Sequence, residues 1–117
     1  MLLREDAPRD DVLLVDAGIG EDAASGALAQ QLGRAFAQAR DGASSLGPHG
    51  SVLFLGSGGP EARSGLAALT RTLALEWAPR GVRVNAVFGS SEAAADLIGF
   101  VCGPASRMLT GAVIDAR

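Results

Sequence analysis

The 117-residue chain contains no tyrosine, and it has a single histidine, a single cysteine and a single tryptophan. Lysine is also absent, so all ten basic residues are arginines. The lone cysteine, Cys102, excludes a disulfide within the chain and favours a reducing compartment. His49 lies in a Pro-His-Gly stretch typical of a solvated loop, and one histidine with one cysteine offers no metal-ligand spacing. We therefore expect no metal site.

The chain also lacks a concentration of positive charge and a long hydrophobic run. Its net charge is -3 and its arginines are scattered, with only four phenylalanines and one tryptophan available for base stacking. This composition argues against nucleic-acid binding. No apolar run could span a membrane, and the acidic N-terminus (MLLREDAPRDD) has no continuous apolar core like that of a signal peptide. We expect a globular cytoplasmic protein without a nucleic-acid or membrane partner.

What the chain does contain is the pattern of one α/β domain. Apolar residues recur at three- and four-residue spacing from Leu66 to Trp77, which predicts a helix from Glu61 that Pro79 and Gly81 end. The apolar run at residues 82–87 is rich in β-branched residues and predicts a buried strand. Further strands are expected at residues 12–15, 51–55 and 112–115, further helices at 22–40 and from Ser91, and loops at 41–50 and 88–90.

The alternation of strands and helices predicts a parallel sheet with helices on both faces. The expected fold class is α/β, a partial Rossmann-like three-layer domain with about four parallel strands. Residues 1–10 read as a flexible tail, because Pro8 opposes an early helix. Residues 11–117 read as a single truncated domain without internal repeats or linkers.

Four segments, in order, resemble the short-chain dehydrogenase/reductase family. DVLLVDAGIG (residues 11–20) is similar to that family's DVLVNNAGI strand and turn, and GSVLFLGS (50–57) to its catalytic-serine strand. ARSGLAALTRTLALEWAPRGVRVNAV (62–87) resembles the active-site helix and following strand, and MLTGAVIDAR (108–117) the C-terminal TG-x-x-I-x-VDGG element. The resemblance, of the 3-oxoacyl-acyl-carrier-protein reductase type, covers only the later part of the family fold.

The resemblance implies positions for a catalytic site, but this chain has lost the residues. The family reduces carbonyls with a tyrosine and a lysine four residues apart on one helix face. These positions fall on Gly59 and Arg63, and Ser57 stands near the catalytic serine. Glycine has no side chain to donate a proton, and arginine keeps its proton permanently. We therefore expect no catalytic residue, and Asn85 in the strand is read as a fold residue.

The cofactor half of the family fold has no counterpart in the sequence. Members bind a nicotinamide nucleotide with a glycine-rich turn after the first strand, whereas only ten residues precede Asp11. Asp16 at a strand end, Gly18 in the G-I-G turn, and Phe88, which replaces the proline of a family Pro-Gly, are the remaining candidates for a cofactor contact. Each is also explained as a turn or capping residue, and no cofactor is expected.

These losses predict a catalytically inactive scaffold or oligomerisation domain. Residues 12–15 would form an open sheet edge, and the helices at 22–40 and 63–78 match the family's oligomer contacts. The expected partner is a second copy or another short-chain-dehydrogenase-like subunit. One alternative is an NAD(P)-dependent carbonyl reductase subunit whose nucleotide site is completed by another chain; another is a gene remnant or excised fragment. A serine hydrolase would need a G-x-S-x-G elbow, which Ser57 lacks.

Overall fold

Four parallel strands form one sheet at the centre of the chain. The computed structural model describes residues 12–17, 25–47, 49–56, 59–89, 91–102 and 108–115. In chain order the elements are β1 (Val12–Asp16), α1 (Ser25–Ala43), β2 (Ser51–Gly56), α2 (Pro60–Trp77), the 3-10 turn η2 (Ala78–Arg80), β3 (Arg83–Phe88), α3 (Ser91–Cys102) and β4 (Val113–Asp115). The expected flexible tail at residues 1–10 lies outside the described residues.

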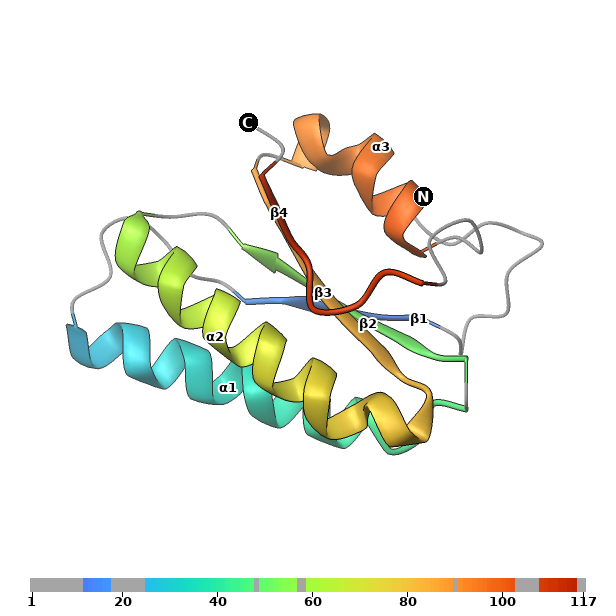
Figure 1. Cartoon of the computed structure of the whole chain (residues 1–117). Helices are drawn as coiled ribbons and strands as arrows, with labels where there is room; N and C mark the ends of the chain where they lie inside the picture. The colour runs from blue at the N-terminus through green and yellow to red at the C-terminus, as the bar shows by residue number, and fades with distance from the viewer. Residues whose placement is uncertain are drawn as a thin grey trace.

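The elements are arranged in three layers, as the sequence predicts. The sheet order is β1-β2-β3-β4, so every strand pairs in parallel with its neighbour in the chain, and β1 and β4 form the two edges. Helices α1 and α2 lie side by side on one face, and α3 covers the other (Figure 1). The α/β fold class and the helices on both faces are therefore confirmed. None of the described helices is long and apolar enough to cross a membrane.

Alternate side chains of the strands fill two apolar layers, because successive residues of a strand point to opposite faces. Phe54 and Phe88 point toward α1 and α2, where they join Leu66, Leu73 and Trp77 in the larger core cluster. Leu53 and Val87 point toward α3 and pack with its Ile98 and Val101. Burial on both faces explains why the central strands are almost continuously apolar.

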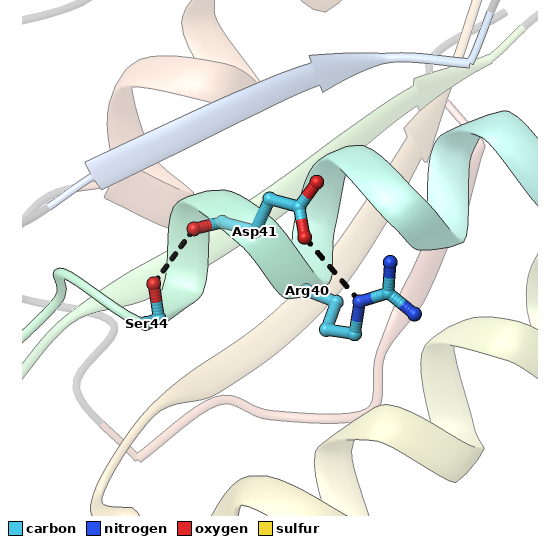
Figure 2. Close-up of polar contacts among 3 residues, drawn as sticks. All are labelled: Arg40, Asp41 and Ser44. Atoms are coloured by element: carbon cyan, nitrogen blue, oxygen red, sulfur yellow. Dashed lines mark hydrogen bonds and ion pairs between the residues drawn. The ribbon is translucent and has the colours of Figure 1, made fainter.

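Helix α1 continues further than the sequence predicts. Residues 41–50 were expected to be loop, but α1 runs to Ala43. The prediction was wrong because Asp-Gly favours turns locally, whereas here Gly42 is the contact point between α1 and β1. A Cβ at Gly42 would lie 2.5 Å from Leu13 Cδ2, so a larger residue here would require the Leu13 side chain to move. Figure 2 shows the end of the helix, where Ser44 Oγ donates a hydrogen bond to the Asp41 carbonyl (2.8 Å) and Arg40 Nε donates to Asp41 Oδ1 (3.3 Å).

The end of α2 is anchored to the end of α1 by one arginine. Pro79 and Gly81 terminate the helix as expected, with Gly81 in the left-handed region (φ 76°) and its N–H donating to the Ala78 carbonyl (2.9 Å). Arg80 Nη2 donates to the Ala43 carbonyl (2.7 Å), and its guanidinium lies 5.7 Å from the Trp77 ring centre. A cation at a helix C-terminus satisfies a free carbonyl and the helix dipole together, which fixes the two helix ends relative to each other.

Candidate functional site at the carboxyl ends of the strands

The carboxyl ends of the four strands meet the N-terminus of α2 at one edge of the sheet. Asp16, Gly56, Phe88 and Asp115 are the last residues of β1 to β4. Open α/β sheets bind their ligands at this edge. Gly59 and Arg63, the positions to which the family resemblance assigns a catalytic pair, lie at this edge as well.

Gly59 and Arg63 occupy the first turn of α2. Gly59 is the N-cap, with φ -83° and ψ -174°, and Pro60 follows at the first helical position. The Arg63 N–H donates to the Gly59 carbonyl (3.0 Å), so the two residues lie one helical turn apart. The structure therefore gives these residues the four-residue helical spacing that the resemblance implies for a catalytic pair. Gly59 brings no side chain to that position.

The guanidinium of Arg63 is held by two partners. Nη1 lies 2.9 Å from Asp115 Oδ2 at the end of β4, and the guanidinium carbon lies 5.1 Å from the centre of the Phe88 ring. The side chains of Arg63 and Asp115 are 27% and 38% exposed. An arginine fork matches a carboxylate, and its flat face suits an aromatic ring. The positive charge at this position is thus neutralised by the fold's own last strand.

Phe88 forms the floor beneath this ion pair. It is 1% exposed and belongs to β3, in register with Gly56 and Asp115, although the sequence suggested that a turn begins there. A Cβ at Gly56 would lie 2.9 Å from Phe88 Cε1 and 2.9 Å from Leu66 Cδ2, so the ring occupies the space that a side chain on β2 would need. The turn prediction for Phe88 was wrong because this glycine lets a large ring complete the strand.

Asn85, three residues earlier on β3, uses its side-chain amide to bind the backbone. It is 0% exposed, its Nδ2 donates to the Leu109 carbonyl (3.0 Å), and its Oδ1 accepts from the Ala112 N–H (3.0 Å). Thr110 Oγ1 accepts from the Val84 N–H (3.0 Å). These bonds attach the segment before β4 to β3, so the reading of Asn85 as a fold residue agrees with its contacts.

The structure places two of the other residues that the sequence singled out. Asp16 ends β1 with an exposed side chain, and His49 is exposed in a turn. Ser57 and Gly18 lie outside the described residues. Among the residues that are described, no three His, Cys, Asp or Glu side chains converge as metal ligands would. Sequence reasoning missed Asp115 as the partner of Arg63, because 52 residues separate the two and only the sheet order brings them together.

Replacing Asp115 with asparagine is expected to lower the free energy of unfolding by only about 0.5–1 kcal/mol, because the ion pair is partly exposed and screened. Added salt should reduce this difference. Chemical denaturation at low and high salt measures it. The matched control is Asp41→Asn in the more exposed Arg40–Asp41 pair (59% and 74% exposed), where we expect no measurable change. Equal losses in the two variants would show that the Arg63 pair is no more than an ordinary surface contact.

The comparisons with known proteins bear on the fold. No protein-family model matches the sequence, and no curated protein sequence is significantly similar to it. Solved structures do match. A dehydrogenase/reductase from Sinorhizobium meliloti superposes with a TM-score of 0.73 at 23% identity, covering 90% of this chain and 61% of its own. BdcA (YjgI) from E. coli gives 0.73 at 27% identity (90% and 59%), and a short chain dehydrogenase from Burkholderia cenocepacia, solved with NADP, gives 0.67 at 25% (90% and 63%).

These neighbours extend well beyond the part that matches. The chain spans about 60% of the length of each, while nearly all of the chain is used in the superposition. The four-stranded parallel sheet, its flanking helices and the ordered sequence segments all correspond to one family fold. The chain has, in partial form, the fold of the short-chain dehydrogenases/reductases.

Proposed function

We propose that this chain is a short-chain-dehydrogenase-like scaffold that carries out no redox chemistry itself and acts by associating with another polypeptide. The observation that carries the proposal is the state of Arg63. Its charge is paired with Asp115 and its face covers Phe88, while Gly59, one turn earlier, has no side chain. Carbonyl reduction needs a proton donor whose pKa is lowered by a nearby cation. Here the donor is missing and the cation is already neutralised.

An association role is supported by surfaces that a monomer would leave unused. Leu75 on α2 is 79% exposed, and its neighbours Arg71 and Thr72 one turn earlier are exposed as well. The exposed described residues of α1 in the same layer combine small and uncharged polar residues with three charged ones: Ala29, Gln30, Gly33, Arg34, Gln38, Arg40 and Asp41. Such a helical surface fits a second helical layer, either from another copy or from a related subunit.

The competing function is a nucleotide-binding subunit whose site is completed by another chain. It draws on two structural neighbours, the B. cenocepacia protein in complex with NADP and BdcA in complex with NADPH. Under this alternative the carboxyl edge of the sheet would contribute to a shared site. The Arg63–Asp115 pair would then have to open for the arginine to reach a phosphate.

Light scattering in line with size exclusion, with and without excess NADPH and NADH, separates the two functions. We expect a discrete assembly whose mass does not depend on nucleotide, and a thermal midpoint that nucleotide does not change. A nucleotide at about a hundred times its Kd would stabilise the fold by about 2.7 kcal/mol, an easily detected shift. Such a shift would contradict the scaffold proposal. Leu75→Glu changes an exposed position on α2. If this variant no longer assembles, the surface through which the chain associates includes α2.

A further inference from the structure

The outward face of α2 carries an apolar stripe. Among the helical residues whose side chains the structure describes, Leu75 is the one large hydrophobic residue left exposed, at 79%. Thr72 and Ala68 are exposed at the preceding turns, and residues spaced by three and four along a helix share a face. These three residues are named the α2 stripe. An exposed leucine alone is ordinary on a monomer, so the charges beside the stripe carry more information.

Arg71 and Glu76 lie on opposite flanks of the α2 stripe. Each residue turns by about 100° around a helix, so these two, five positions apart, point about 140° away from each other. Both are exposed, and the structure gives neither side chain a hydrogen bond or an ion pair among the residues it describes. They cannot pair with each other, as residues three or four apart can. Each charge can therefore pair outside the chain.

The five-residue spacing of these charges favours a parallel pair of α2 helices. When two parallel helices are related by a two-fold axis, opposite flanks face each other, and charges five residues apart pair between the helices, as in a parallel coiled coil. Arg71 then meets Glu76 of the second copy, and symmetry repeats the contact. An antiparallel pair instead places Arg71 on the same flank as the second copy's Arg71. The charges therefore favour the parallel pair and disfavour the antiparallel one.

The neighbours of α2 differ on the two flanks. A Cβ at Gly65 would lie 2.6 Å from Leu32 Cδ1, and Gly65 is three helical turns from Glu76, so α1 borders α2 on the Glu76 flank. Of the described helices, only α1 packs beside α2 on this face of the sheet (Figure 1). In a parallel pair, α1 of each copy lies toward the Arg71 flank of the other copy. The contact then extends beyond one pair of helices, as a stable interface requires.

We propose that the chain forms a parallel two-fold dimer in which α2 packs against α2 of a second copy. The two Leu75 side chains meet on the axis, and an Arg71–Glu76 pair lies on each flank. This rests on the proposed association role and names the partner as a second copy. Burial of the α2 stripe stabilises the dimer, while the charges set its direction and register.

Charge exchange across the seam tests the proposal in the full chain. Light scattering in line with size exclusion, over a dilution series, gives the dissociation constant of the dimer. Arg71→Glu and Glu76→Arg each place like charges at two symmetric positions and should raise that constant about tenfold or more, an effect that added salt reduces. The double variant restores opposite charges and should return to within about threefold of the parent. Circular dichroism verifies that each variant is folded.

Two further sets of variants control for net charge and for helix direction. Asp96→Arg, exposed on α3 across the sheet, makes the same charge change as Glu76→Arg and should leave the dissociation constant unchanged. In a Cys102→Ser background, Ala68→Cys and Leu75→Cys should each form a disulfide with the second copy, because a parallel pair places each position beside itself. An antiparallel pair allows this at only one of them, since they lie about 10.5 Å apart along the helix.

The outcomes separate this dimer from the association role on which it rests. A parent chain that stays monomeric overturns the dimer and leaves the association role to a different polypeptide. A dimer that the single charge variants do not weaken, or that the folded double variant does not restore, has its interface elsewhere and also overturns the proposal. A disulfide at only one of the two cysteine positions does the same. A nucleotide-dependent thermal shift, in contrast, contradicts the scaffold function and leaves the dimer measurements valid.

Discussion

Replacing Phe88 with alanine is expected to lower the free energy of unfolding by about 3–5 kcal/mol. The side chain is 1% exposed and packs in the larger core cluster between the sheet and α2. Gly56 has no side chain, which leaves space for the Phe88 ring. For the same reason, Gly56 cannot fill the cavity that removal of the ring would create. The guanidinium of Arg63 would also lose the surface over which it lies. Urea denaturation followed by circular dichroism measures the change.

The control is Phe88→Leu, which keeps most of the apolar volume and should cost less than about 2 kcal/mol. This substitution removes the ring. Arg63→Ala, compared in the parent chain and in the Phe88→Leu variant, therefore isolates the contact between cation and ring, about 0.5–1 kcal/mol. A loss below about 1.5 kcal/mol for Phe88→Ala would contradict the structure, because such a loss is too small for a buried ring. It would mean that the end of β3 is solvated.

The helices, the central strands and their arrangement could be predicted from the sequence, because the signals for each element lie within that element or directly beside it. The apolar spacing from Leu66 to Trp77 and the Pro79–Gly81 stop define α2 within one residue. The segments that became β2 and β3 are buried on both faces, so short continuous apolar runs, rather than periodicity, predicted them. A parallel sheet followed from the alternation of strands and helices. These features depend on residues close together in the chain.

The misassigned features depend on contacts between distant residues. Gly42 lies in α1 with the end of the Leu13 side chain packed closely against it, and Phe88 lies in β3 where Gly56 leaves room for its ring. Asp115 reaches Arg63 only because β4 pairs next to β3. No local pattern distinguishes these residues from ordinary turn or surface residues. The missing tyrosine and lysine could be read from the sequence, but the neutralised arginine in their place could not.

Asn85→Leu is expected to lower the free energy of unfolding by about 2–4 kcal/mol. The leucine fills a similar volume, but it leaves the Ala112 N–H and the Leu109 carbonyl without these partners, and each unsatisfied group costs about 1–3 kcal/mol. The direct backbone bonds from Ala86 N to the Ala112 carbonyl and from Gly111 N to the Val84 carbonyl remain. We therefore expect local loosening before β4 as well as global destabilisation. Hydrogen exchange at the Ala112 amide should accelerate beyond the global change.

Asn85→Asp separates the two hydrogen bonds by pH. The carboxylate still accepts from the Ala112 N–H, but it can donate to the Leu109 carbonyl only when it is protonated. Burial and the nearby Leu109 carbonyl, which accepts a hydrogen bond only from the protonated form, raise the pKa of the introduced carboxyl above its unfolded value of about 3.9. The folded state then binds more protons than the unfolded state between the two pKa values, so stability falls as pH rises through that window. Denaturation at acidic and neutral pH measures the slope, with the parent chain as reference. A variant whose stability relative to its parent does not change with pH would show that the side chain at position 85 is solvated, and that β4 and the Asp115 it carries are not held against β3 as described.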